Sequence, residues 1–283
     1  MHKVDPIFIA PRLVARDWGR SDLGDWFKAN TCAPAPVAEA WICDPSNPTE
    51  AGSLGDRLAR LTAPMLGDLG RAPPRLRLVF PGNDAILPST SPVSFWTILE
   101  PGHRTGHAPG HKPGDRIRAY EGAAVALAGG SVALEVSSSF QPANHPQEGL
   151  SLIRLPPVSA RTRATLFREA ALSVERWRLP AWSRLVPDGE TCHVLMALTR
   201  GVRVDDRFLQ PGEAVFVPAL GRAIDIAAQG QAAALVAYPD TRPTSIWRHT
   251  PGPDPEPTVL AEILSGPSSP DAEGPRPRQD HAA

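Results

Sequence analysis

Three histidines with regular spacing are the most conspicuous candidates for metal chemistry. His103, His107 and His111 follow one another at intervals of four residues. On a helix they would share one face, and three imidazoles can bind zinc or a similar metal. However, glycines and prolines interrupt the stretch 102–113 and oppose a helix. We therefore expect an exposed loop with incidental metal affinity, and a metal site at these residues remains the alternative.

Two further residues are candidates for acid–base catalysis. Glu135 lies in the apolar run 131–136, and His145 follows in a stretch rich in proline. General acid–base catalysis requires a group that titrates near neutrality, which histidine provides and a buried glutamate can provide. The sequence contains nothing that orients the two residues toward each other, so an exposed loop position for His145 is the competing interpretation.

Aromatic and basic side chains are candidates for binding a sugar or a phosphate. Trp18 and Trp96 offer ring faces that can stack on the C–H groups of a sugar, although tryptophans of a small barrel more often belong to its core. Lys112 and Arg116 could contact a phosphate, or could form part of a solvated loop. For Glu39 we expect a structural, hydrogen-bonded carboxylate, and for His193 a packing role.

Composition narrows the range of functions and compartments. The chain has 283 residues, 29 Lys+Arg and 30 Asp+Glu, so its formal charge is -1 and no excess of positive charge favours nucleic acid or an anionic membrane. Three widely spaced cysteines indicate neither a disulfide scaffold nor a metal knuckle. We find no secretory signal and no apolar run long enough to span a bilayer. The expected location is the cytoplasm, and neither nucleic acid nor a membrane is an expected partner.

The pattern of apolar runs and turns predicts a mostly β protein. Short apolar runs alternate with Gly- and Pro-containing turns, which favours antiparallel sheets in a sandwich or jelly roll over a parallel α/β sheet. The runs are 76–80, 93–99, 123–128, 131–136, 193–199, 202–204, 214–217, 224–227 and 232–238.

Helical signals occur at two places before residue 243, and residues 258–264 could form a further turn of helix. Leu54, Leu58 and Leu61 would share one face of a short helix capped by Ser53. The segment 161–175 is also predicted to be helical and to link two halves of the protein. Beyond residue 243 the chain is rich in proline and is predicted to be disordered.

Two segments repeat one arrangement that resembles the second half of a cupin barrel. Pro113-Gly114-Asp115 and Pro211-Gly212-Glu213 each precede a strand that ends near Gly or Pro. The repetition suggests a bicupin, with two jelly-roll units. We expect an N-terminal segment 1–75 packed on the first unit, a first unit at 76–160, a linking helix and second unit at 161–242, and a tail at 243–283.

The order of several motifs resembles the class I mannose-6-phosphate isomerases. Trp18-Gly19 is followed by the strand Val37-Ala38-Glu39-Ala40-Trp41, then by the helix near residues 52–61 and a strand at 76–85. The resemblance covers about 240 residues, taken in order along the chain. It implies a metal-dependent aldose–ketose isomerase of sugar phosphates.

The sequence departs from this family where zinc ligands would be expected. The resemblance implies ligands from a Gln-x-His-Pro strand, a Lys-Thr-Glu segment and a Gly-Thr-x-His turn. These positions correspond to 89–92, to 93–96 and to 122–125, which offer serines, tryptophan and Val125 instead. Serine and valine are poor replacements for imidazole and carboxylate.

The sequence therefore leaves three functions, which we rank in order. The first is an isomerase-like cupin, or pseudoenzyme, that has no zinc or other cofactor and binds a sugar, a sugar phosphate or a protein without isomerising it. The second is an active isomerase that uses a metal relocated to the three histidines. The third is a structural subunit of a complex.

Overall fold

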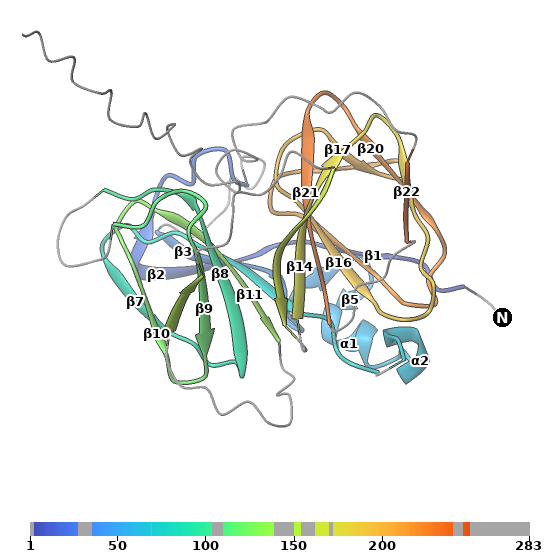
Figure 1. Cartoon of the computed structure of the whole chain (residues 1–283), viewed down its shortest axis with the longest axis horizontal. Helices are drawn as coiled ribbons and strands as arrows, with labels where there is room; N and C mark the ends of the chain where they lie inside the picture. The colour runs from blue at the N-terminus through green and yellow to red at the C-terminus, as the bar shows by residue number, and fades with distance from the viewer. Residues whose placement is uncertain are drawn as a thin grey trace, which may run out of the picture.

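The fold consists mainly of antiparallel β-strands arranged in two units (Figure 1). The structure is a computed structural model that describes residues 3–27, 36–68, 70–103, 110–138, 150–153, 162–169, 172–239 and 246–249. The predicted all-β fold with two cupin-like units is confirmed. Within the described ranges, no helix is long and apolar enough to cross a membrane.

The first unit is formed by a seven-stranded sheet and a two-stranded sheet. In spatial order the larger sheet comprises β12 (Leu150–Ile153), β9 (Arg116–Tyr120), β8 (Val93–Glu100), β11 (Val132–Ser138), β6 (Arg75–Val79), β3 (Val37–Cys43) and β2 (Arg12–Arg20). The smaller sheet pairs β7 (Ala85–Pro88) with β10 (Ala124–Leu127). Most of the apolar runs predicted for this half are therefore strands.

The second unit combines an eight-stranded and a five-stranded sheet. The eight strands are β13 (Arg163–Glu169), β14 (Leu172–Leu179), β21 (Ala232–Tyr238), β16 (His193–Ala197), β19 (Ala214–Val217), β1 (Ile7–Ile9), β4 (Pro48–Thr49) and β5 (Gly52–Ser53). The five strands are β18 (Arg207–Leu209), β17 (Val202–Val204), β20 (Ile224–Ala228), β15 (Ser183–Leu185) and β22 (Trp247–His249).

The repeated Pro-Gly turns occur once in each unit and have the same backbone geometry. Gly114 has φ of 82° and Gly212 has φ of 89°, which is a left-handed conformation that favours glycine. A Cβ atom at Gly212 would also lie 2.4 Å from the Phe27 ring. These turns therefore require glycine.

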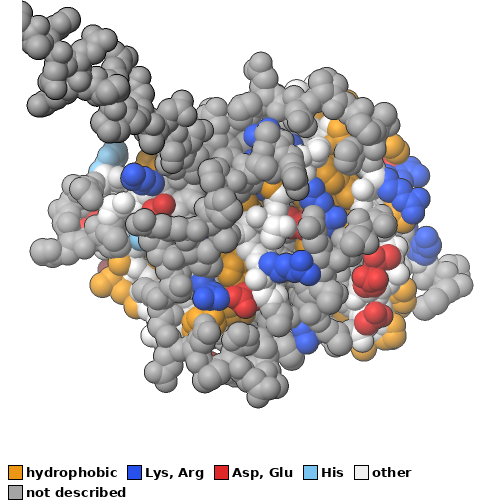
Figure 2. Space-filling view, viewed as in Figure 1, with side chains coloured by type: hydrophobic (Ala, Val, Ile, Leu, Met, Phe, Trp, Pro, Cys, Tyr) orange, Lys and Arg blue, Asp and Glu red, His pale blue; other side chains and the backbone are white. Residues whose placement is uncertain are grey.

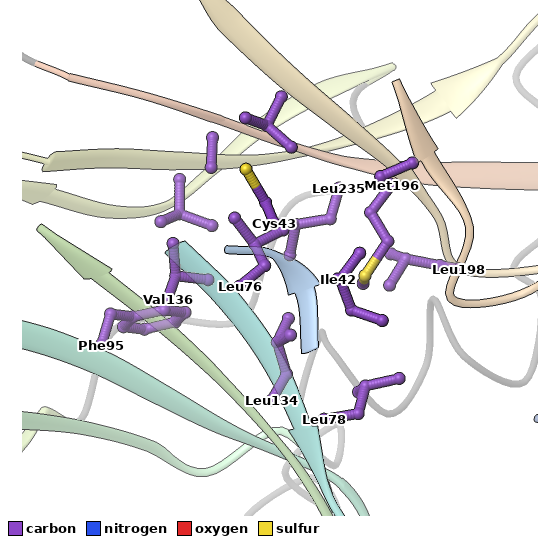
Figure 3. Packing of buried hydrophobic residues seen from close by; sticks show 14 of the residues in the cluster. Ile42, Cys43, Leu76, Leu78, Phe95, Leu134, Val136, Met196, Leu198 and Leu235 are labelled. Atoms are coloured by element: carbon purple, nitrogen blue, oxygen red, sulfur yellow. The ribbon is translucent and has the colours of Figure 1, made fainter. Parts of the chain in front are cut away.

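The largest apolar core lies where the two large sheets face each other. Ile42, Leu76, Leu134 and Phe95 from the first unit pack with Met196, Leu198 and Leu235 from the second (Figure 3). Because side chains alternate along a strand, the residues between these positions point to the opposite face, into the interior of each unit. The two interiors have separate apolar clusters.

The N-terminal segment contacts both units rather than only the first. Strands β2 and β3 belong to the first sheet, whereas β1 pairs with β19 of the second unit. Helix α1 (Leu54–Leu58) confirms the predicted short helix, and Ser53 caps it by accepting from the backbone N–H of Asp56 at 3.1 Å. Helix α2 (Ala63–Leu66) follows, and the carbonyl of Leu66 accepts from Cys192 of the second unit.

The predicted linking helix at 161–175 is wrong. The segment forms β13 and the beginning of β14, two antiparallel strands that pair through Phe167 and Val174. Its alanines, arginines and glutamates favour a helix locally. The alternation of apolar and polar residues from Leu172 onward fits a strand instead; β14 is buried along its whole length, and pairing with β21 stabilises it.

The beginning of the proline-rich tail is also placed differently from the prediction. Ile246 is fully buried, and β22 pairs with β15. The ring of Trp247 stacks on Trp177 with 4.5 Å between ring centroids. The second unit therefore extends past residue 243, and the rest of the tail, from residue 250, lies outside the described residues.

Candidate functional site

One row of side chains crosses four neighbouring strands inside the first unit. Trp41 on β3 is paired in register with Arg77 on β6, Arg77 with Glu135 on β11, and Glu135 with Trp96 on β8. Directly paired residues of adjacent strands point to the same side of a sheet. This side faces away from the core between the units and toward the cluster that contains Trp96 and Val125.

Arg77 is the centre of this row. Its Nε donates to Oε2 of Glu135, and its Nη1 donates to Oε1 of Glu39 at 3.1 Å. Its guanidinium lies 5.2 Å from the centroid of the Trp41 ring and 5.4 Å from that of Trp96. Trp41 completes the network by donating from Nε1 to Oε2 of Glu39 at 3.1 Å. One cation thus binds two carboxylates between two indole rings.

Burial sets the electrostatics of this network. Glu135 is 5% exposed, and burial raises its pKa above the ordinary value. Arg77 and a hydrogen bond from Ser94 act in the opposite direction, while the charge of Glu39 acts in the same direction as burial. Two carboxylates against one guanidinium give the network a formal charge of about -1 when all three are ionised. Its carboxylate oxygens can accept further hydrogen bonds, for example from hydroxyl groups.

The positions matched to zinc ligands hold hydroxyl and apolar groups. The Oγ atoms of Ser89 and Ser94 are 3.1 Å apart, and Ser94 Oγ accepts from Trp96 Nε1 at 3.0 Å. Val125 is packed in the apolar interior. In the part of the chain that the structure describes, no group of three or more His, Cys, Asp or Glu side chains could hold a metal ion. The residues at these positions do not fit the zinc site that the resemblance implies.

The predicted histidine and acid–base candidates are only partly described. His111 Nε2 lies 3.2 Å from the carbonyl of Ala126, and its Nδ1 lies 3.7 Å from Asp115. The backbone N–H of His103 donates to Gly129, and its side chain lies against Gly130. His107 and His145 lie outside the described residues, so the structure does not show how either is placed.

The predicted ligand-binding residues do not converge on one site. Trp96 is fully buried in the row described above, and Trp18 is packed against the same interior cluster. The backbone N–H of Lys112 donates to Asp115. Arg116 is 4% exposed on the opposite side of the sheet, because its neighbour Ile117 belongs to the interior cluster.

A similar network lies inside the second unit. Trp177 Nε1 donates to Oε2 of Glu175 at 2.9 Å, and Arg163 Nε donates to the same oxygen at 2.5 Å. The Arg163 guanidinium is 5.6 Å from the Trp177 ring centroid. Tyr238 donates its hydroxyl to Oε1 of Glu175 at 2.9 Å. Glu175 is completely buried. Burial, followed by the charge of Glu175, raises the pKa of Tyr238.

His193 lies next to this second network. It is fully buried, its ring centroid is 5.2 Å from that of Tyr238, and neither ring nitrogen has a hydrogen-bond partner among the residues that the structure describes. Burial, followed by the charge of Arg163, lowers its pKa to about 3. The imidazole is therefore neutral at physiological pH. The packing role expected from the sequence agrees with its complete burial.

Sequence reasoning missed the two arginines that organise the interiors. Arg77 lies in the strand that was correctly predicted near residues 76–80. A single charged residue among the apolar residues of this strand could have indicated a buried, paired arginine. Arg163 was missed because its segment was predicted to be helical. Glu39 is hydrogen-bonded as expected, but its partner Arg77 comes from a strand distant in sequence.

Comparison with known proteins identifies the fold. No protein-family model matches the chain, and no curated protein matches its sequence. Solved structures do match. The chain shares its fold with mannose-6-phosphate isomerases.

Three of these structures illustrate the likeness. An Archaeoglobus fulgidus protein assigned to the mannosephosphate isomerases is 14% identical, with a TM-score of 0.61 over 85% of this chain and 100% of that one. The mannose 6-phosphate isomerase of Bacillus subtilis is 16% identical, with a TM-score of 0.56 over 82% and 99%. The apo enzyme of Salmonella typhimurium is 12% identical, with a TM-score of 0.58 over 84% and 100%.

Proposed function

We propose that this protein binds a sugar or a sugar phosphate in the interior of its first unit without isomerising it and without a bound metal. The observation that carries the proposal is the binding of both interior carboxylates, Glu39 and Glu135, by Arg77. Aldose–ketose isomerisation needs a base that removes a proton and a group that polarises the carbonyl. Here the Arg77 guanidinium binds both carboxylates, which leaves neither of them unpaired to act as the base. Serines and Val125 stand at the positions matched to the metal ligands.

The same network provides groups suited to sugar recognition. Carboxylate oxygens accept hydrogen bonds from hydroxyl groups, and an indole face contacts apolar C–H groups. Trp41 is half-buried, whereas Trp96 is fully buried, so Trp41 is the ring through which a ligand would reach the row. The alternative is that a protein, rather than a sugar, binds beside Trp41.

The raised pKa of Glu135 favours one competing function, an isomerase in which this carboxylate transfers the proton. That function needs a metal or another electrophile elsewhere, such as one bound by His103, His107 and His111. A structural subunit is the third possibility, and it would bind neither sugar nor metal.

One set of measurements separates these functions. Isothermal titration with mannose, mannose 6-phosphate and fructose 6-phosphate is combined with an isomerase assay and elemental analysis of the untagged protein. We expect binding without turnover and without stoichiometric metal. Isomerase activity with about one metal ion per chain, both lost on replacing the three histidines by alanine, would overturn the proposal.

A pair of variants tests where the ligand binds. Trp41→Leu removes the half-buried ring and should weaken binding by about tenfold or more. Trp182→Leu is the matched control, because Trp182 is 47% exposed on the second unit. Equal binding by both variants would place the ligand elsewhere, and binding by neither variant nor wild type would favour the structural role.

A further inference from the structure

A second arginine lies at the outer end of the row that contains Trp41. Arg12 is on the edge strand β2 and is paired in register with Trp41 on β3. Its chain neighbour Leu13 packs against the core between the units, so Arg12 points to the opposite side, toward the interior of the first unit. Directly paired residues of antiparallel strands have Cβ atoms about 5 Å apart. Trp41 therefore lies between two arginines in the row, Arg12 on one side and Arg77 on the other.

The guanidinium of Arg12 differs from that of Arg77 in its hydrogen bonding. Arg77 binds Glu39 and Glu135. The Nε atom of Arg12 is buried, and no residue that the structure describes accepts a hydrogen bond from it, while the side chain as a whole is partly exposed. A buried donor without an acceptor is unfavourable. A ligand that presents an oxygen acceptor beside Trp41 would remove this cost.

The charges along the row indicate which ligands Arg12 would select. The Glu39–Arg77–Glu135 network has a formal charge of about -1, so by itself it disfavours an anion. Arg12 brings the formal charge of the row to about zero and places its positive charge beside Trp41, across the ring from Arg77. A phosphate or a carboxylate matches the planar fork of a guanidinium with two oxygens and an opposite charge.

The charges on the visible surface do not provide this selectivity. On the face shown in Figure 2, the described Lys and Arg side chains lie in separate places, among acidic and apolar side chains. The chain as a whole has a formal charge of -1. A broad positive field would attract anions from a distance, whereas scattered charges of both signs would not. Selection of an anionic ligand then depends on an individual arginine at the site.

We infer that Arg12 is a specificity-determining residue of the proposed sugar site, and that it selects sugars that carry a phosphate or a carboxylate group. In this arrangement the sugar ring stacks on Trp41, a hydroxyl group donates to Glu39, and the anionic group accepts from Arg12. The inference rests on the proposed function, because it assigns a ligand class to the same site.

Isothermal titration with three related sugars tests the inference. Mannose is neutral, mannose 6-phosphate carries a phosphate, and mannuronate carries a carboxylate. We expect wild type to bind at least one of the two anionic sugars about tenfold or more tightly than mannose. Arg12→Gln should lose this preference and bind mannose as wild type does. Comparison of the two anionic sugars then shows whether phosphate or carboxylate is the preferred group.

Two further variants serve as controls. Arg16 lies on the same strand with an exposed side chain, so Arg16→Gln removes an equal charge nearby and should keep the wild-type preference. Arg12→Lys keeps the charge but loses the planar fork, and should keep only part of the preference. Arg12→Lys also keeps the test decisive if Arg12→Gln does not fold, which a melting curve of each variant checks.

The outcomes separate this inference from the proposed function. The inference is wrong, and the proposed sugar site stands, if wild type binds mannose as tightly as both anionic sugars. It is equally wrong if Arg12→Gln keeps the preference or if Arg16→Gln loses it to the same extent. If wild type binds none of the three sugars, the proposed function fails and the inference fails with it.

Discussion

The interiors of the two units contain the same local arrangement of three side chains. In each, a Trp donates its indole N–H to the Glu two residues earlier, as Trp41 does to Glu39 and Trp177 to Glu175. An Arg directly across from the Trp on the neighbouring strand covers its ring and binds the same Glu: Arg77 in the first unit and Arg163 in the second. The arrangement follows from cross-strand pairing, because paired and alternate residues share one face.

The two copies differ in what surrounds them. The first has a second carboxylate, Glu135, and its Glu39 is 7% exposed beside a half-buried Trp41. In the second copy Glu175 and Trp177 are both fully buried, and the hydroxyl of Tyr238 donates a further hydrogen bond to Glu175. The two copies therefore differ in their added side chain, which is Glu135 in the first unit and Tyr238 in the second, and in burial, because only the first copy lies beside a half-buried ring.

Loss of the central carboxylate should affect the two units very differently. Glu175→Gln leaves the partly buried Arg163 beside an uncharged and fully buried amide, and we expect the free energy of unfolding to fall by about 3–5 kcal/mol. Glu39→Gln should cost only about 1 kcal/mol, because Glu135 still binds Arg77. Urea unfolding followed by tryptophan fluorescence measures both values.

The control for this pair is an exposed carboxylate. Glu50 forms an ion pair with Arg207 but is largely solvent-exposed, so Glu50→Gln should change stability by less than about 1 kcal/mol. If Glu39→Gln and Glu175→Gln lowered the free energy of unfolding by similar amounts, the expected difference in burial between the two networks would be contradicted.

Removal of the indole N–H donor should also destabilise the second unit more than the first, but with a smaller difference in the free energy of unfolding. Trp177→Phe deletes the hydrogen bond to the buried Glu175 and weakens the stacking on Trp247, at a cost of about 1.5–3 kcal/mol. Trp41→Phe should cost less than about 1 kcal/mol, because water can replace the donor at the half-buried edge. The comparison would fail if Trp41→Phe were the more destabilising of the two in the same unfolding assay.

Acid should destabilise the second unit through His193. Its folded-state pKa of about 3 lies below the ordinary value of 6.5, so the unfolded state binds the proton more strongly. This contribution is fully present above pH 6.5 and is lost as the pH falls toward 3, by up to about 1.4 kcal/mol per pH unit. Unfolding measured between pH 7.5 and 5.5 should show a shallower loss for His193→Phe than for wild type, and identical slopes would contradict this assignment.

Much of the fold could be predicted from local sequence patterns. The short apolar runs, the capped helix after Ser53 and the repeated Pro-Gly turns were all identified, because alternation, capping and left-handed glycines depend on neighbouring residues. The prediction for the segment 161–175 was wrong because its structure depends on residues that are distant in sequence. Its strands are stabilised by pairing with β21, which lies about 60 residues later in the chain.

The sequence by itself determined the β-rich architecture of two units and the residue types, serines and Val125 among them, at the positions that the resemblance matches to zinc ligands. Only the tertiary structure decided which polar residues meet: Glu39, Arg77 and Glu135 come from three separate segments, and a shift of one residue in strand register would move any of them to the opposite face. Register and sheet packing are collective properties, and they decide which of many plausible charged residues share a site.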